Sequence, residues 1–236
     1  MYNLTTKNGF RILQAIPSRS NAWLVMKDDF SLLVDSGKKK SRNQLLENLS
    51  SVLNNGNSLQ YLFLTHTHYD HCQSAKELLE RYSCNIIVSD KAVSSIAAGY
   101  TKLPRGTNNL TRFLTATAHA FFKNNFSYNP FRADTIISED CIISSDFPGI
   151  KIILTPGHSA DSISLIVDDE VAIVGDAMFG IFRGNIFPPF ADDIPEMLRS
   201  WRKLLDTGCA TFLPGHGRAI SRELLEKEYN KYSRAQ

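Results

Sequence analysis

The chain has 236 residues, with 26 Lys and Arg against 24 Asp and Glu. Its net charge of +2 lacks the broad basic excess that nucleic-acid binding requires, so composition excludes nucleic acid as the main partner. No run of about 18 apolar residues occurs, which argues against a membrane-spanning helix. The four cysteines lack the short repeated spacings of a disulfide framework, so we expect reduced thiols in a cytoplasmic protein.

The first part of the chain alternates between predicted strands and helices. Short apolar runs bounded by turn residues indicate strands, and leucines at helical spacing indicate helices. The predicted elements are strands over 10–16, 22–26 and 30–34, a helix over 45–53, a strand over 59–65, a helix over 74–82 and a strand over 85–88.

The segment 100–133 differs in composition from the rest. Seven of the chain's 24 aromatic residues (14 Phe, 8 Tyr, 2 Trp) lie within residues 99–132. An even distribution would place about three or four there, and a long insertion in a compact domain is often functional. We expect one or two helices that form a lid over a substrate cleft, although aromatic rings that simply pack into the core would give the same composition.

Strands resume after the insertion, and no linker, low-complexity tract or close repeat divides the chain. We therefore expect one domain over 1–236, with two groups of strands that are each followed by helices. The predicted elements are strands over 135–137, 141–143, 150–154, 162–167 and 171–174, a helix over 195–205, a strand over 210–213 and a helix that begins near 221.

A histidine-rich motif follows the apolar strand that ends at residue 64. His66, His68, Asp70 and His71 form the pattern His-x-His-x-Asp-His. Chains of this composition contain that pattern by chance about twice in 10,000 cases, so the false-positive risk is low. In an extended segment, residues two apart point to the same side, so His66 and His68 can share one metal ion. Asp70 and His71 lie where the chain turns into the next helix and can bind a second ion.

Three further metal-competent residues occupy a repeated context. His158, Asp176 and His216 each follow an apolar strand through a short segment that contains glycine, which allows close backbone approach. If these strands belong to the same layered body, their carboxyl ends converge on one edge.

These residues resemble the ligand motif of the metallo-β-lactamase-fold hydrolase superfamily, in the order in which that family has them. The resemblance spans residues 22–217 and implies a four-layer αβ/βα sandwich with a dinuclear site at one edge. It implies that His66, His68 and His158 hold one metal ion. It further implies that Asp70, His71 and His216 hold the other, and that Asp176 bridges the two.

Ligand chemistry agrees with this assignment. Nitrogen and oxygen ligands without a thiolate suit two divalent ions, Zn first, with Fe or Mn as alternatives. Two such ions can hold a bridging water whose pKa falls to about 7, and the resulting hydroxide is the expected nucleophile. Asp70 is the candidate catalytic residue, either orienting the hydroxide or passing its proton to the leaving group.

Substrate contacts are less clearly marked in the sequence. We expect Tyr69, Phe179 and Arg183 to line the cleft, with loop packing as the alternative for the last two. His119, in the aromatic insertion, is either a general acid that reaches the site or a surface or packing residue. Asp35 and Ser159 are candidates for orienting ligand histidines.

Other polar groups near the motif have simpler interpretations. The run Lys38 to Lys40 can bind an anionic substrate, but charge runs are usually solvated, and we favour that interpretation. The thiol of Cys72 adjoins the motif, yet the nitrogen and oxygen ligand set is complete without it, so we expect a buried inert side chain.

Departures from the family's branches narrow the expected substrate. Asp70 stands where the classical lactamases have cysteine, so antibiotic hydrolysis is disfavoured. The chain resembles the glyoxalase II and lactonase-like branch, but Asp161 replaces a glycine of the former, and the substrate-orienting tyrosine of the latter cannot be placed. We expect hydrolysis of a small ester, lactone, thioester or phosphodiester, with an iron-dependent oxidoreductase similar to persulfide dioxygenases as the alternative. The oligomeric state stays open.

Overall fold

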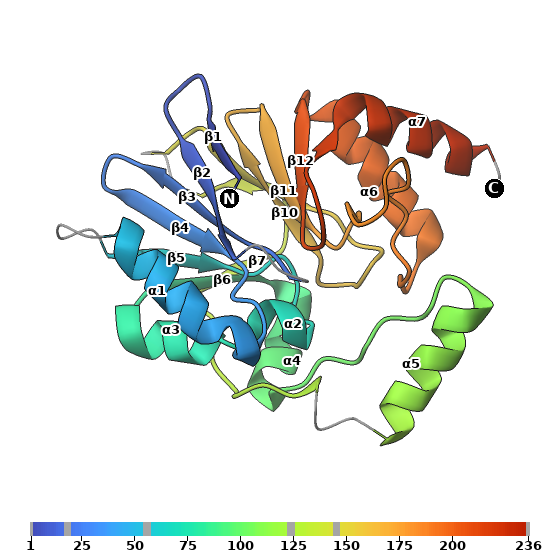
Figure 1. Cartoon of the computed structure of the whole chain (residues 1–236), viewed down its shortest axis with the longest axis horizontal. Coiled ribbons are helices and arrows are strands. Elements are labelled where there is room, and N and C mark those ends of the chain that lie inside the picture. The colour runs from blue at the N-terminus through green and yellow to red at the C-terminus, as the bar shows by residue number, and fades with distance from the viewer. Residues whose placement is uncertain (1, 17–19, 54–57, 122–125, 144–146, 235–236) are drawn as a thin grey trace.

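A computed structural model of the chain describes residues 2–16, 20–53, 58–121, 126–143 and 147–234. Within α5 (Asn109–Phe121), the structure describes the backbone but not the side chains of residues 114, 116 and 118–121. Two β-sheets pack face to face, and helices cover the outer face of each (Figure 1). This arrangement confirms the predicted αβ/βα sandwich.

The first sheet has seven strands in chain order, from β1 to β7. Strands β1 to β4 form an antiparallel meander, whereas β4 to β7 are parallel because helical connections join them. The strands are β1 (Asn3–Thr5), β2 (Arg11–Ile16), β3 (Ala22–Lys27), β4 (Phe30–Val34), β5 (Tyr61–Phe63), β6 (Asn85–Ser89) and β7 (Thr135–Ile137).

The second sheet has six strands in the order β13-β12-β11-β10-β9-β8. Its strands pair antiparallel except for β11 and β12, which are parallel. The helix α6 (Ile194–Asp206) provides the crossover between those two strands. The strands are β8 (Cys141–Ile142), β9 (Ile150–Leu154), β10 (Ile163–Val167), β11 (Val171–Gly175), β12 (Thr211–Pro214) and β13 (Ile220–Ser221).

Helices cover both outer faces. On the first sheet lie α1 (Arg42–Val52), α3 (Ala75–Tyr82) and α4 (Val93–Ala98), and on the second lie α6 (Ile194–Asp206) and α7 (Arg222–Ser233). The single-turn α2 (Tyr69–Cys72) directly follows the connection after β5. Figure 1 shows α5 standing off the sandwich, with an extended segment leading to it from α4. Two short 3-10 helices span Lys39–Ser41 and Asp90–Ala92.

Side-chain alternation along the strands produces these layers. In β3, Leu24 packs toward the helices of the first sheet, whereas Trp23 and Val25 pack between the two sheets. Leu33 and Leu32 of β4 divide in the same way. Both faces of the central strands are therefore buried, which explains their continuous apolar runs.

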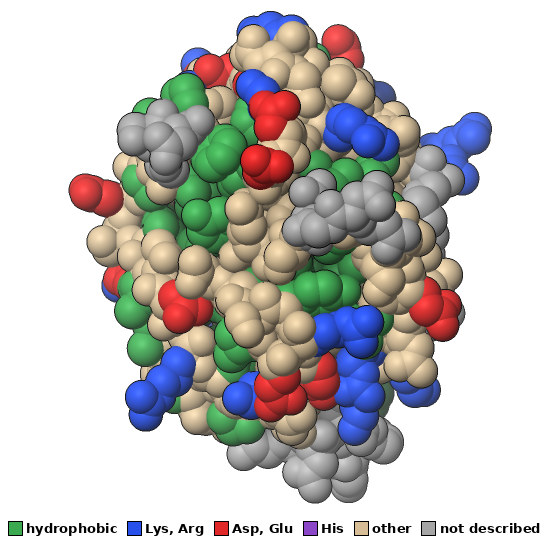
Figure 2. Space-filling model, turned by 90° about the vertical axis from the view of Figure 1, so that its left-hand side faces the viewer, with side chains coloured by type: hydrophobic (Ala, Val, Ile, Leu, Met, Phe, Trp, Pro, Cys, Tyr) green, Lys and Arg blue, Asp and Glu red, His purple; other side chains and the backbone are tan. Residues whose placement is uncertain are grey.

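The face of the molecule drawn in Figure 2 has no single dominant chemical character. The face in Figure 2 carries hydrophobic, basic and acidic side chains, and no histidine of the coloured, described residues is visible there. Among the described residues, no helix has the length and apolar character needed to cross a membrane.

Trp201 of α6 provides a test of this packing. Its ring is fully buried and its Nε1 donates a hydrogen bond of 2.6 Å to the carbonyl of Ala177. Replacing Trp201 with Ala creates a cavity and leaves that carbonyl unpaired, so we expect the free energy of unfolding to fall by about 3–5 kcal/mol. Urea denaturation of Trp201→Ala and wild type measures the difference. A loss below about 1 kcal/mol would show that α6 contributes little to the core.

Candidate metal centre

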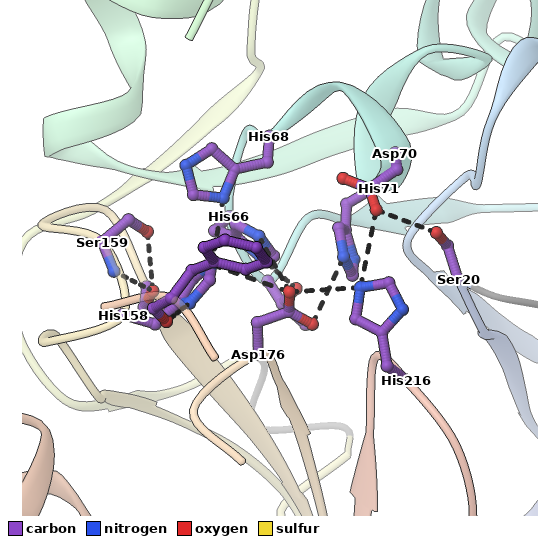
Figure 3. Close-up of polar contacts among 12 residues, drawn as sticks. Ser20, His66, His68, Asp70, His71, His158, Ser159, Asp176 and His216 are labelled. Atoms are coloured by element: carbon purple, nitrogen blue, oxygen red, sulfur yellow. Dashed lines mark hydrogen bonds and ion pairs between the residues drawn. The ribbon is translucent and has the colours of Figure 1, made fainter. Parts of the chain in front are cut away.

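All seven predicted ligands lie at one end of the sandwich, where strands of both sheets end (Figure 3). His66 and His68 follow β5, and Asp70 and His71 belong to α2. The remaining three, His158, Asp176 and His216, follow β9, β11 and β12. The carboxyl ends of strands from the two sheets therefore converge, as the repeated sequence context indicated.

Glycine at position 215 makes room for this convergence. A Cβ there would overlap Oδ1 of Asp176 and Cε1 of His71, so a larger residue would displace two of the predicted ligands. The turn is also fixed by its backbone, because Gly215 N donates to the carbonyl of Gly175 at 2.7 Å.

The ligand atoms form three overlapping groups, in each of which they lie within 4.8 Å of one another. Asp176 is central, since its carboxylate oxygens lie 3.2–4.0 Å from nitrogen atoms of four histidines. The groups are His66, His68 and His158; His66, His71 and Asp176; and Asp70, His71 and His216.

Several of these atoms are buried without a hydrogen-bond partner. Among the described residues they include Nε2 of His66, Nε2 of His71 and Oδ1 of Asp176. An unpaired buried polar atom costs about 1–3 kcal/mol, so three of them facing one another need an explanation. A bound cation would satisfy all three. The donor set therefore fits a metal centre on the evidence of its own unpaired atoms.

Outer hydrogen bonds orient two of the histidines through Asp35. His71 Nδ1 lies 2.8 Å from Oδ2 of Asp35, and the hydroxyl of Thr65 donates to the same carboxylate. Thr65 uses its only hydroxyl proton in the hydrogen bond to Asp35. Its Oγ1 therefore acts as the acceptor of the hydrogen bond from His66 Nδ1, at 3.1 Å. Both histidines consequently turn Nε2 toward the centre.

Backbone carbonyls orient two others. His158 Nδ1 donates to the carbonyl of Phe190 at 2.9 Å, and His68 Nε2 donates to that of Lys102 at 3.2 Å. His158 therefore presents Nε2, whereas His68 presents Nδ1, and these two nitrogens lie 3.0 Å apart. Lys102 belongs to the predicted insertion, so this segment participates in orienting the site.

The surroundings of the ligand histidines lower the pKa of three of them and raise the pKa of a fourth. Burial lowers the pKa of His66 and His68, and it lowers the pKa of His158 to about 4, so these imidazoles are neutral at pH 7. Burial also opposes charge on His71, but Asp176 and Asp35 outweigh it and raise its pKa well above the usual value.

Both ligand carboxylates are anionic at neutral pH. Burial disfavours the charge on Asp176, but His216 and His71 hold its pKa well below the usual value. The same two histidines, together with Lys38, lower the pKa of Asp70 against the opposing effect of burial. The second carboxylate also accepts a hydrogen bond of 3.1 Å from Ser20, and Figure 3 shows that contact.

A cavity of about 710 Å³ opens next to these residues. Tyr69, Asp70 and Phe179 line it, and the ring of Phe179 stacks on His216 at 4.7 Å. Arg183 is exposed and is not among the lining residues described. His119 belongs to α5, but its side chain lies outside the described part of the chain.

Lys38 behaves differently from its neighbours in the lysine run. Lys39 and Lys40 are exposed, as a solvated run predicts. Lys38 is half-buried, lines the cavity, and has Nζ 4.0 Å from Oδ2 of Asp70. The preceding Gly37 has a φ of +68° and bridges to Cys72 of α2, which brings Lys38 to the site.

Other side chains around the motif have supporting contacts. Asp161 is buried and accepts hydrogen bonds from the backbone and hydroxyl of Thr67, between His66 and His68. Cys72 is a buried thiol whose pKa burial raises well above the usual value, and it donates to the carbonyls of Thr67 and His68. The hydroxyl of Ser159 bonds to Ser162.

The base of the insertion is attached to the metal-ligand loop. Thr101 Oγ1 donates to Thr67 Oγ1 at 2.9 Å and lies 2.8 Å from the hydroxyl of Tyr128. The two ends of the insertion, at Thr101 and Tyr128, therefore lie next to Thr67, the residue between His66 and His68. From α5 itself, Thr115 lines the cavity.

Comparisons with known proteins agree with this geometry. A probable metallo-hydrolase of Methanocaldococcus jannaschii is 30% identical over 206 residues, covering 84% of this chain and 87% of that protein. An atrochrysone carboxyl ACP thioesterase of Aspergillus fumigatus is 24% identical over 219 residues, covering 92% of this chain. This chain spans only 56% of the thioesterase's length.

Solved structures share the fold. An archaeal metallo-beta-lactamase superfamily protein from Sulfolobus tokodaii has a TM-score of 0.61 at 21% identity, covering 92% of this chain and 81% of that one. A protein crystallised in a di-iron-bound form has a TM-score of 0.64 at 20% identity, with coverages of 96% and 98%. The model of the Metallo-beta-lactamase superfamily matches residues 15–216, which include every predicted ligand, and the chain belongs to that superfamily.

Proposed function

We propose that the chain is a dinuclear metal-dependent hydrolase of a small ester, lactone, thioester or phosphodiester. The observation that carries this proposal is the set of buried, unpaired ligand atoms that face one another. His66, His68 and His158 would hold one divalent cation, and Asp70, His71 and His216 the other, with Asp176 between them. The relatives named as a thioesterase and a probable metallo-hydrolase support a hydrolytic reaction.

The all-nitrogen-and-oxygen donor set suits Zn, and it also suits Fe or Mn. The chemistry that two bound cations supply is activation of water at neutral pH and polarisation of the scissile carbonyl or phosphoryl oxygen. Asp35, through Thr65 and His71, keeps the ligand nitrogens oriented before any cation binds. The four cysteines are free thiols, which supports a cytoplasmic location.

Asp70 is the proposed catalytic residue. Its carboxylate lines the cavity, accepts from Ser20 and lies 3.5 Å from His216 Nε2. Because its pKa is lowered, it is ionised at neutral pH and can accept a proton from the attacking water and pass it to the leaving group. Lys38 Nζ, at 4.0 Å, stabilises that charged form.

Tyr69 and Phe179 are proposed substrate contacts, because both line the cavity. Burial and the nearby Asp70 raise the pKa of Tyr69 to about 12, so its hydroxyl stays protonated and can donate to substrate. We also propose that residues 1–236 form a single domain in which the segment 100–133 acts as a lid. Within that lid, His119 is a proposed substrate contact. We also retain Arg183, which is exposed, as a proposed substrate contact.

Removing the central carboxylate tests the proposal. We expect Asp176→Ala and Asp176→Asn to lower kcat/KM by about a thousandfold or more, because several kcal/mol of transition-state stabilisation disappears. Steady-state kinetics on ester, lactone, thioester and phosphodiester panels measures the effect, and circular dichroism checks the fold. Asp169→Ala, which removes an exposed carboxylate at the opposite end of β11, is the control and should keep full activity. An Asp176 variant with wild-type activity would contradict the proposal.

Asp35 tests the orientation of the ligands. Asp35→Asn should weaken metal affinity about 10- to 100-fold, because the histidines lose their negatively charged hydrogen-bond partner. Competition titration of the metal-free protein with a chromophoric chelator measures the affinity. Asp28→Asn is the matched control, since Asp28 and Asp35 both have positive φ (48° and 61°) and Asn tolerates that conformation. Equal affinities in the two variants would exclude the orienting role.

The same donor set supports a second candidate, an iron-dependent oxidoreductase similar to persulfide dioxygenases, because imidazole and carboxylate accept iron readily. An oxygen electrode distinguishes the two functions. We expect the iron-loaded protein to consume no oxygen with glutathione persulfide while hydrolysing a member of the panel. Stoichiometric oxygen uptake without hydrolysis would establish the oxidoreductase instead.

A further inference from the structure

Exposed hydrophobic side chains gather in two segments that lie far apart in the sequence. Eight large hydrophobic side chains are exposed in the described part of the chain. Leu110 and Phe113 of α5 are two of them, and Ile181 and Phe182, in the loop after β11, are two more. Of these four side chains, Ile181 is among the residues that line the cavity.

Hydrogen bonds join these two segments into one wall. Thr107 N donates to the carbonyl of Pro189 at 3.0 Å, and Ala191 N donates to that of Arg105 at 2.8 Å. A backbone bridge between Gly106 and Phe190 lies between these bonds. The wall is therefore formed before a ligand arrives, which lowers the entropy that binding must overcome.

The wall contributes an apolar surface to the cavity, which we name the apolar lane. Its side chains carry no hydrogen-bonding group, and its two prolines lack a backbone N–H as well. The lane consists of Leu103, Pro104, Ile181, Pro189 and Phe190 of the wall, together with Phe126, which lines the same cavity.

The inner end of the apolar lane adjoins the metal centre. The carbonyl of Phe190 accepts the hydrogen bond from His158, and His158 lines the same cavity. The outer end reaches solvent at Ile181, which is 53% exposed. A ligand can therefore place one end at the predicted metal ligands while its other end runs along apolar surface to the mouth.

From this continuity we infer that the apolar lane binds the acyl chain of an ester or thioester. This inference rests on the proposed hydrolase and specifies its substrate class. A nucleotide or sugar would lose hydrogen bonds to water along the lane without replacement, whereas an alkyl chain gains about 0.8 kcal/mol for each buried methylene. A cavity of about 710 Å³ is large enough for a drug-sized ligand.

A series of p-nitrophenyl esters, from acetyl to decanoyl and kept below micellar concentrations, tests the inference. Hydrolysis breaks the acyl C–O bond and transfers the acyl group to water, giving a carboxylate and p-nitrophenol. We expect kcat/KM to rise by up to about fourfold per added methylene, and by at least about a hundredfold from acetyl to octanoyl. Values that stay level or fall with chain length would overturn the inference while leaving the proposed hydrolase intact.

A matched pair of variants locates the effect. Ile181→Asp introduces a charge into the lane, and Ile136→Asp introduces the same charge on β7, where the isoleucine is also 53% exposed. We expect Ile181→Asp to lower the ratio of octanoyl to acetyl kcat/KM at least about tenfold, and Ile136→Asp to preserve it. Equal ratios in both variants would show that the lane does not hold the chain.

Direct binding separates failure of the inference from failure of the proposed function. Isothermal titration calorimetry of the wild-type protein with decanoate and acetate should detect only decanoate, with Ile181→Asp weakening it. Decanoate binding without hydrolysis of any member of the ester, lactone, thioester and phosphodiester panels would support the lane and overturn the hydrolase. Hydrolysis without decanoate binding or a chain-length preference would support the hydrolase and overturn the inference about the lane.

Discussion

The candidate metal centre depends on one buried carboxylate. Asp176 is 5% exposed and lies within 4.0 Å of nitrogen atoms of four histidines. Burial alone strongly disfavours an anion in that position, and the interactions with His216 and His71 offset this cost. Those histidines follow strands of both sheets, so the sandwich must hold both sheet ends in register. The face-to-face core between the sheets supplies that rigidity.

The insertion contacts the candidate metal centre directly. Its backbone orients His68, and its two ends meet at Thr67 through the hydroxyls of Thr101 and Tyr128. On the other side it joins the loop whose Phe190 carbonyl orients His158. Movement of this segment would therefore alter ligand orientation and substrate access together. Any change in the insertion that alters substrate selection must therefore preserve these hydrogen bonds.

Sequence reasoning predicted the fold and the residues that form the candidate ligand cluster, because both leave local signals. Apolar runs mark buried strands, and rare side chains at strand ends mark the chemistry. The orienting carbonyls of Lys102 and Phe190 leave no such signal, since any residue supplies a carbonyl and only tertiary structure aims it. The position of Lys38 was also missed, because charge patterning cannot reveal the turn at Gly37.

The boundaries of the elements likewise depend partly on local sequence signals and partly on tertiary contacts. The predicted strand over 59–65 contracts to Tyr61–Phe63, because Thr65 N donates to the Asp35 side chain instead of a neighbouring strand. The short elements β1, β13 and α4 were not predicted, since two to six residues carry too little periodicity. The aromatic insertion yields one described helix, α5, and its wider role depends on contacts that composition cannot specify.

Anomalous X-ray diffraction from crystals of the metal-loaded protein, recorded at the absorption edge of the bound metal, tests the central claim most directly. The account predicts two anomalous peaks, one among His66, His68 and His158 and one among Asp70, His71 and His216, with Asp176 between them. The absence of any peak there, or a peak bound by other residues, would contradict it.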